Sequence, residues 1–116
     1  MKITILNALF FLTFIFSYER INFTSANPFS FRDIITNLEN QESQDVYGIL
    51  RFPDNYDSNK KYPLIIGVAG SLDWSNHHYE YLDMYRNLGI ATFELNSFKS
   101  RGVKSTVGSQ RKLLQQ

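Results

Sequence analysis

The sequence predicts an α/β fold built around one parallel strand–helix–strand unit, with a single strand before it and a signal-like hydrophobic helix at the N-terminus. An apolar run at 64–68 is followed by a helical pattern and by a second apolar run at 90–95. A unit of this order and length forms parallel strands joined by a right-handed crossover in nearly all known cases. Hydrophobic residues make up 43% of the chain, which is enough to pack a core.

The N-terminus has the pattern of an export signal. Residues 3–16, ITILNALFFLTFIF, are nearly all apolar and follow the single charge of Lys2. As a helix these residues span about 21 Å, which is short of the roughly 30 Å of a bilayer core, so a cleaved signal is favoured over a permanent anchor. Small residues at 24–26 predict cleavage before Asn27. We therefore expect a signal peptide, or an N-terminal membrane anchor, over 1–26 and an exported domain, periplasmic or secreted, over 27–116.

Cysteine and charge exclude several classes of protein. The chain has no cysteine, which excludes disulfides, thiolate metal sites and a thiol nucleophile. Five basic and ten acidic residues lie between 27 and 98, whereas 99–116 carry five basic and no acidic residues. These basic residues are widely spaced and lack interleaved aromatic residues, so we expect no nucleic-acid partner.

Before the parallel unit, the sequence predicts little regular structure. A short helical turn is expected over Asp33–Leu38 and a polar loop over Glu39–Gln44. Residues Val46–Phe52, VYGILRF, are rich in strand-forming residues and end at Pro53, which cannot continue a ladder. Short polar side chains at 54–59 then predict a surface turn.

The parallel unit begins at Leu64–Val68, whose continuous apolar run is typical of a strand covered on both faces. A helix is expected to begin near Ser75, whose hydroxyl can cap its first turn. It is expected to end before Gly89, because glycine readily adopts the left-handed conformation that ends a helix. The second buried strand is expected over Ile90–Leu95. The apolar stripe of the helix recurs at helical spacing and is expected to face the sheet; its members are His78, Tyr81, Leu82, Tyr85 and Leu88.

Two loops leave the carboxyl ends of these strands, where parallel α/β sheets bind ligands. They cover 69–74 and 96–102. Gly70 lets the backbone approach a bound atom, and amides ahead of a helix point toward developing negative charge, so the first loop predicts an oxyanion hole. The alternative is that Gly70 only makes a tight turn.

Residues 46–110 resemble the N-terminal part of the dienelactone hydrolase family of α/β-hydrolases. The resemblance rests on PLIIGVAGS, WSNHH and LGIATFELNSFKSRGV, and the segment from Asn96 to Val103 is its most specific part. Two positions depart from the family pattern, because Ala69 stands where histidine is usual and Asn96 where aspartate is usual. The resemblance implies a truncated α/β-hydrolase sheet, with one N-terminal strand before the parallel unit.

The resemblance also implies which catalytic groups this chain contains and which it does not. It assigns the oxyanion donor to the backbone amide of Ser71, beside Gly70. No Gly-x-Ser-x-Gly elbow occurs in the 116 residues, so we expect no catalytic side chain in this chain. The intact parent would hydrolyse an ester or lactone without a cofactor. The rival interpretation is a small secreted, non-catalytic binding module on the same scaffold.

Further candidates carry weaker signals. Trp74 could line a substrate pocket and Arg101 could bind a substrate carboxylate, although packing and solvation are the alternatives. His77 and His78 are adjacent on the expected helix and diverge by about 100°, so we expect no metal site. Only one helix is available to cover two parallel strands, so we expect the chain alone to be marginally stable. The open edge of the sheet could recruit a second copy, which the sequence does not rank.

Overall fold

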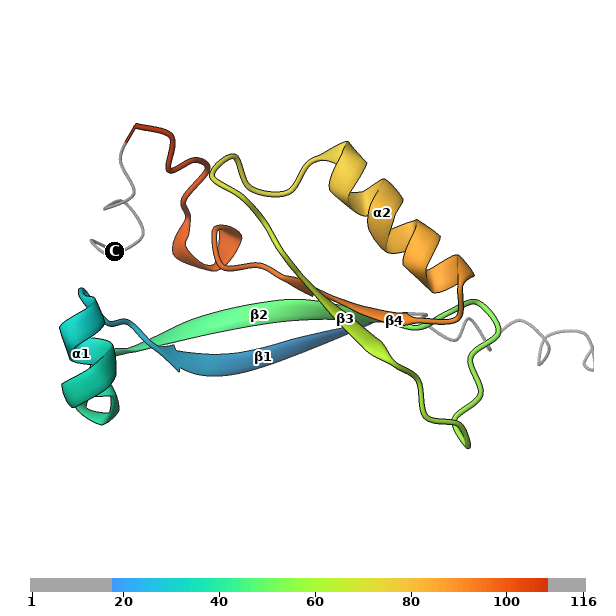
Figure 1. The fold of residues 1–116 in the computed structure, drawn as a ribbon, viewed down its shortest axis with the longest axis horizontal. Coiled ribbons are helices and arrows are strands. Elements are labelled where there is room, and N and C mark those ends of the chain that lie inside the picture. The colour runs from blue at the N-terminus through green and yellow to red at the C-terminus, as the bar shows by residue number, and fades with distance from the viewer. Residues whose placement is uncertain (1–17, 109–116) are drawn as a thin grey trace, which may run out of the picture.

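The structure is a computed structural model that describes residues 18–108, and it shows a mixed four-stranded sheet with two α-helices, a small α/β fold (Figure 1). The sheet order is β1-β2-β4-β3. Along the chain the elements are β1 (Tyr18–Ala26), α1 (Phe31–Thr36), the 3₁₀ turn η1 (Leu38–Asn40), β2 (Ser43–Arg51), β3 (Leu64–Val68), α2 (Asn76–Asn87), β4 (Ala91–Leu95) and the 3₁₀ turn η2 (Lys99–Arg101).

The expected signal helix falls outside this range. Residues 3–16 precede the described part of the chain, and the end of the basic tail follows it. Among residues 18–108, no helix has the length and apolar character needed to cross a membrane.

The expectation of one strand before the parallel unit was wrong, because there are two. β1 pairs antiparallel with β2 over nine residues, from Tyr18 opposite Arg51 to Ala26 opposite Ser43. The expected end of the signal therefore lies within a strand. The period-two alternation of Arg20-Ile21-Asn22-Phe23 is a strand pattern that the neighbouring hydrophobic run concealed.

A capping box fixes α1 two residues before the expected helical turn. Ser30 is its N-cap, and the Ser30 amide donates to Asp33 Oδ2 at 2.8 Å while the Asp33 amide donates to Ser30 Oγ at 3.3 Å. This reciprocal pair satisfies two amides at the helix start. Figure 1 shows α1 at the end of the β1–β2 hairpin that is remote from α2.

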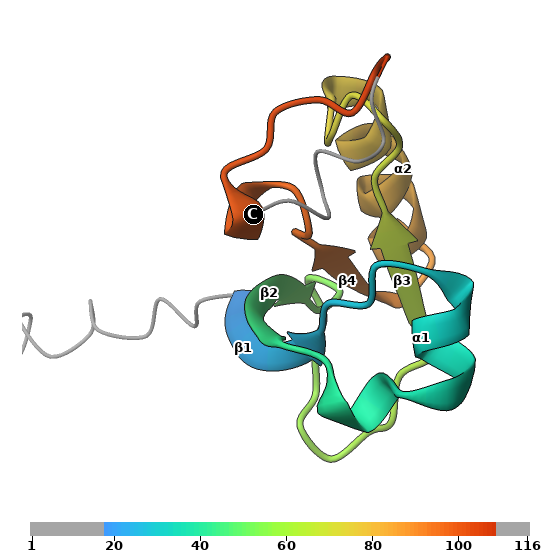
Figure 2. The same ribbon diagram turned by 90° about the vertical axis from the view of Figure 1, so that its left-hand side faces the viewer.

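The parallel unit is confirmed, with each strand boundary within one residue of the expected position, and Figure 2 shows α2 on one side of β3 and β4. β3 pairs in parallel with β4, from Leu64 opposite Ala91 to Val68 opposite Leu95. β2 runs antiparallel to β4 on the other side, so β4 is an interior strand. Gly89 follows α2 with φ 81°, the left-handed conformation expected of a stop.

Helix α2 covers one face of the sheet but is rotated from the expected orientation. Leu82 is buried beside Gly67, where an added Cβ would meet both Leu82 and Trp74. By contrast, Tyr81 and Leu88 of the expected stripe are 58% and 71% exposed. Tyr79 faces inward instead, because its ring stacks on Trp74 with centroids 5.6 Å apart.

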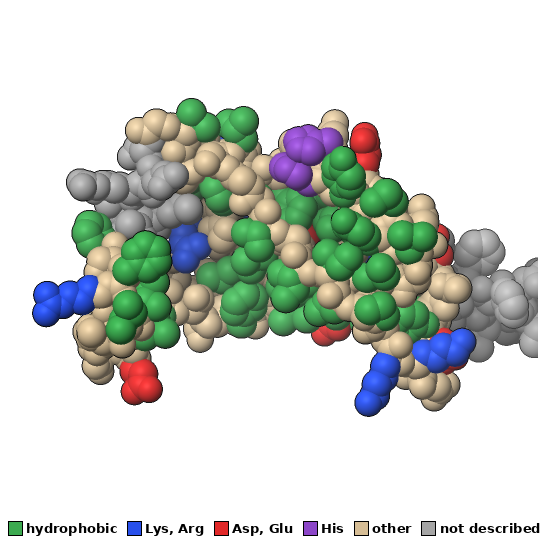
Figure 3. All heavy atoms as spheres, in the orientation of Figure 1, with side chains coloured by type: hydrophobic (Ala, Val, Ile, Leu, Met, Phe, Trp, Pro, Cys, Tyr) green, Lys and Arg blue, Asp and Glu red, His purple; other side chains and the backbone are tan. Residues whose placement is uncertain are grey.

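The face of the sheet opposite α2 is exposed along β3. Its β3 side chains are exposed: Leu64 by 50%, Ile66 by 61% and Val68 by 66%. Figure 3 shows hydrophobic side chains gathered over the middle of the molecule, where β3 crosses the sheet in Figure 1. The expectation that one helix would cover only one face of the parallel unit is met within residues 18–108.

Candidate active site

The two loops that follow β3 and β4 meet beyond the carboxyl ends of these strands, as expected for a parallel pair. The Thr106 amide donates to the Ser71 carbonyl at 2.9 Å. Trp74 Nε1 donates to the Leu95 carbonyl, also at 2.9 Å. These two bonds hold the loop after β3 against the chain that leaves β4.

Gly70 and Ser71 form the start of a tight turn in the first loop. The Asp73 amide donates to the Gly70 carbonyl at 3.0 Å and closes the turn. Gly70 is exposed, its φ is outside the left-handed region, and a Cβ added there would meet nothing within 4 Å. The turn therefore does not require glycine. Ser71 is also exposed, and within 18–108 no acceptor lies in hydrogen-bond range of its amide.

Two buried oxygens at this edge have no hydrogen-bond partner within the described residues: Asp73 Oδ1 and Asn96 Oδ1. Asp73 adopts a left-handed conformation with φ 63°, which is strained for a residue other than glycine. Asn96 is fully buried at the end of β4, and its Nδ2 donates to Glu94 Oε1 at 3.0 Å. Both free oxygens can accept a donor. The sequence singled out Asn96 only as a departure from a family pattern and gave no signal for Asp73.

Trp74 is held by packing rather than by an open pocket. Besides its bond to Leu95, its ring stacks on Tyr79 and meets the edge of His78 at 5.7 Å between centroids. Its six-membered ring lies over Gly67, which leaves no room for a Cβ there. The Trp74 side chain thus fixes the loop of residues 69–74 against the sheet.

Arg101 points away from this loop toward β2. Its Nε donates to the Gln44 side chain and its Nη1 donates to the Ser97 carbonyl at 3.1 Å. Burial lowers the pKa of Arg101, which is the cost of removing a guanidinium from water. These contacts join η2 to the hairpin, and the structure does not bring Arg101 to Gly70 or Ser71.

A charged cluster that the sequence did not predict lies between α2 and β4. Glu94 is buried on the α2 face, where Tyr79 donates to its Oε1 at 3.5 Å. Burial acts to lower the pKa of Lys99, but the Tyr79 hydroxyl, Glu94 and Asp73 outweigh it and raise that pKa. Lys99 therefore stays protonated beside the loop.

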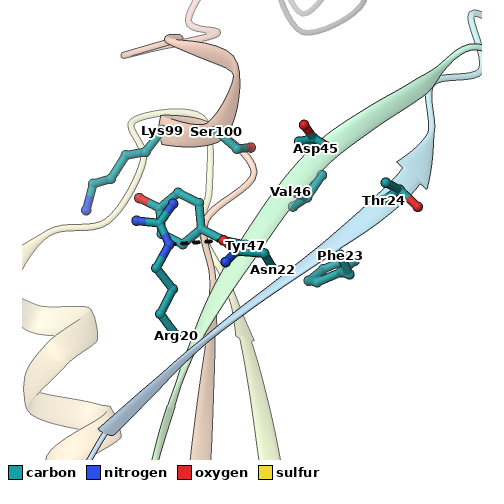
Figure 4. A pocket seen from close by; sticks show the side chains of 9 residues that line it. All are labelled: Arg20, Asn22, Phe23, Thr24, Asp45, Val46, Tyr47, Lys99 and Ser100. Atoms are coloured by element: carbon teal, nitrogen blue, oxygen red, sulfur yellow. Dashed lines mark hydrogen bonds between the residues drawn. The ribbon is translucent and has the colours of Figure 1, made fainter.

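Lys99 also borders a hollow of about 580 Å³ on the α2 side of the hairpin. Figure 4 shows Arg20 against the Tyr47 ring, with its guanidinium carbon 3.7 Å from the ring centroid and its Nε bonded to Asn22. Neither Gly70 nor Ser71 lines this hollow. It is separate from the candidate oxyanion loop.

The adjacent histidines both reach the N-cap of α2. His77 Nδ1 lies 2.9 Å and His78 Nδ1 lies 3.2 Å from Ser75 Oγ, and the centroids of the two rings are 3.9 Å apart. Divergence along a helix therefore did not separate them, because their side chains fold back toward the cap. No cluster of three or more metal-ligating side chains occurs in the described range.

Comparisons with family models, with curated proteins and with solved structures found no match to this chain.

Proposed function

We propose that this chain is the N-terminal part of an exported α/β-hydrolase similar to dienelactone hydrolases. In this proposal the amide of Ser71 donates to the oxyanion that forms during hydrolysis of an ester or lactone, while the nucleophile belongs to another segment of the intact enzyme. The chain alone is then inactive.

The observation that carries the proposal is the combination of a free amide and a glycine that the backbone does not need. Gly70 has open space around it, so its lack of a side chain leaves room for a ligand rather than for another part of the protein. The amide of Ser71 has no acceptor in the described residues and lies at the carboxyl edge of β3. Preorganised amides at such an edge stabilise negative charge in the transition state.

The serine–histidine contacts of the described residues belong to a helix cap. Ser75 is the only serine hydroxyl bonded to histidine rings within 18–108, and it is the N-cap of α2. Both imidazoles contact that same hydroxyl, and no carboxylate is bonded to either ring among these residues. This geometry is typical of helix capping, whereas a triad needs a carboxylate that orients the base.

The proposal is tested on this chain and on a longer product of its gene. The chain alone should hydrolyse p-nitrophenyl acetate no faster than buffer. A longer product should contain Gly-x-[Ser/Cys]-x-Gly followed by aspartate and histidine, and it should be active. An active chain without that elbow, or an inactive longer product that carries it, contradicts the proposal.

Two substitutions at Ser71 separate the amide from the hydroxyl in an active longer product. Ser71→Pro removes the N–H at the second position of the Gly70–Asp73 turn, where proline is tolerated. Loss of an oxyanion donor lowers kcat about 10²- to 10³-fold. The matched control, Ser71→Ala, keeps the amide and should change kcat less than about threefold. Equal losses would exclude the backbone role.

The alternative function is a small secreted binding module, which the open apolar face of the sheet favours. In that case the apolar surface itself binds the partner. Both proposals predict that the protein is exported. Fractionation of cells that express the full chain tests this prediction directly.

A further inference from the structure

The hollow beside the β1–β2 hairpin lies where the sheet is only two strands wide. β1 pairs with β2 over nine residues, whereas β4 pairs with β2 only from Gly48 to Arg51. The rest of β2 has η2 beside it in place of a third strand, and Arg101 of η2 donates to Gln44 there. The volume of the hollow, about 580 Å³, is within the usual range of small-molecule sites.

Most of the residues that line the hollow are polar. β1 contributes Asn22 and Thr24, and β2 contributes Tyr47 and Asp45. The strand register places Asn22 opposite Tyr47 and Thr24 opposite Asp45, and residues that lie opposite one another share a face of the sheet. η2 contributes Lys99 from the side. The hollow is therefore lined from three elements by groups that form hydrogen bonds with a polar ligand.

Arg20 is held in a fixed orientation in this hollow. Its guanidinium carbon lies 3.7 Å from the centroid of the Tyr47 ring, and its Nε donates to Asn22 Oδ1 at 3.1 Å. Among residues 18–108, both Nη nitrogens of Arg20 are left without a hydrogen-bond acceptor or an ion pair. A guanidinium held in this way can donate two hydrogen bonds to one anionic group.

Lys99 adds a second positive charge to the hollow. Figure 4 shows the charged ends of Arg20 and Lys99 on one side of it and the Asp45 carboxylate on the other. The carboxylates of Glu94 and Asp73 attract Lys99, but within the described range neither forms an ion pair with it. The hollow thus has a cationic end and an acidic end.

This distribution of charge selects the class of ligand. A phosphate monoester is largely dianionic at neutral pH, because its second pKa is about 6, and it matches two positive charges where a carboxylate matches one. The carboxylate of Asp45 repels a second anionic group but accepts a hydrogen bond from a hydroxyl. We propose that this hollow binds a phosphate monoester whose other end carries hydroxyl groups, such as a sugar phosphate.

In the bound state, Arg20 and Lys99 donate to the phosphate oxygens, and Asp45 accepts from a hydroxyl of the ligand. The site is independent of the proposed hydrolysis, because neither Gly70 nor Ser71 lines the hollow. It requires β1 in the exported protein, since β1 supplies Arg20.

Isothermal titration calorimetry of the full chain tests the proposal with glucose 6-phosphate, glucose and inorganic phosphate. The titrations are made at constant ionic strength and about pH 7.5, where the ester is largely dianionic. Glucose 6-phosphate should bind at least about tenfold more tightly than glucose, which makes no charge-assisted hydrogen bond to a cation. It should also bind more tightly than inorganic phosphate, which has no sugar hydroxyl to donate to Asp45.

Substitution of either cation should weaken binding of the ester. Arg20→Gln and Lys99→Met should each cost about tenfold or more in affinity. Arg20→Lys keeps the charge but not the paired donors, so its affinity should fall between those of wild type and Arg20→Gln. Arg32→Gln and Lys60→Met are the matched controls, because both residues are exposed and neither lines the hollow. Thermal melting shows that each variant is folded.

Asp45→Asn tests the acidic end. It removes the repulsion that Asp45 exerts on every anion, so the informative quantity is the affinity for glucose 6-phosphate divided by that for inorganic phosphate. This ratio should fall, because a neutral amide accepts a hydroxyl less strongly than a carboxylate does. An unchanged ratio would contradict the role of Asp45.

Other outcomes would overturn the proposal as a whole. Equal binding of glucose and glucose 6-phosphate, or equal losses in the control variants, would exclude a phosphate site at Arg20 and Lys99. Tighter binding of phosphoethanolamine than of glucose 6-phosphate would assign the acidic end to an amine. Binding to vesicles only when they contain phosphatidic acid, with no binding of the soluble ester, would favour a lipid surface instead.

Discussion

Gly48 and Gly70 differ in what a side chain would meet. Gly48 lies under the ring of Phe93, whereas Gly70 stands in open space. Glycine is therefore needed for packing at the first position and is dispensable for the fold at the second. The absence of a side chain in the candidate oxyanion loop is a functional feature in this account.

This contrast predicts opposite effects of the same substitution. Gly48→Ala should destabilise the chain by about 1 to 3 kcal/mol, because Phe93 must leave its position. Gly70→Ala should change stability by less than about 0.5 kcal/mol. Urea unfolding followed by circular dichroism measures both, and equal effects would contradict the packing at Gly48.

Lys99 gives the fold a dependence on alkaline pH. Its pKa is raised above the ordinary value of 10.5, so its charge stabilises the folded state below that pH. This contribution is lost as pH rises through the raised pKa. Wild type should therefore lose stability relative to Lys99→Met above about pH 10.5.

Tyr79→Phe is the control for this titration. It removes the hydroxyl that is the strongest of the groups raising the pKa of Lys99, and the alkaline loss should begin at lower pH. Urea midpoints between pH 8 and 12 measure it. A wild-type profile that Tyr79→Phe leaves unchanged would exclude the contact.

At the scale of elements, the parallel unit could be predicted because its signals are local. An apolar run, a helix between Ser75 and Gly89 and a second apolar run fixed both strands within one residue. β1 could not be predicted in the same way, because its pairing with β2 joins residues 17 to 33 positions apart and its sequence adjoins the signal-like run. The rotation of α2 also escaped prediction, since the stacking of Trp74 on Tyr79 is a tertiary contact.

The candidate site was predictable only in its location. Strand ends placed the loop of Gly70 and Ser71 at the carboxyl edge, where it lies. The bond from Arg101 to Gln44 could not be derived from local spacing, because Gln44 belongs to a distant strand.

Strand β1 should contribute strongly to stability. A chain that starts at Asn27 lacks β1 and exposes the edge of β2, whereas a chain that starts at Tyr18 keeps all nine paired residues. We expect the shorter chain to unfold at a lower urea concentration or without a cooperative transition. Equal midpoints would show that β1 is dispensable, as cleavage before Asn27 requires. Mass spectrometry of the exported protein gives its actual start.

Trp74 should act as an anchor for the loop. Trp74→Phe keeps most of the ring packing but loses the bond to Leu95, which is worth about 0.5 to 1.5 kcal/mol. Trp74→Ala should cost more than this, up to the roughly 3 to 5 kcal/mol of fully buried aromatic side chains, because Trp74 is half-buried. Unfolding in urea distinguishes them, and a residue that only binds substrate would show neither loss.

Within residues 18–108 the molecule is a sheet with one face covered by a helix and the other face exposed along β3. The exposed apolar side chains on β3 contribute little to the stability of the fold, because an apolar side chain stabilises the folded state only when it is buried. The same arrangement leaves the free edge of β3 and its exposed side chains on the face opposite α2 without cover within the described residues. Under the proposed function, the marginal stability expected of the chain alone and its expected lack of a nucleophile have one structural origin.

Hydrogen exchange of the full chain, resolved by residue, tests this origin most directly. Alternate amides of β3 point toward its free edge, whereas β4 is bonded on both sides. The account predicts strong protection along β4 and exchange of the outward β3 amides at nearly the rate of an unstructured peptide. Protection of every β3 amide to the level of β4 would show that this edge is already occupied, and would contradict the account.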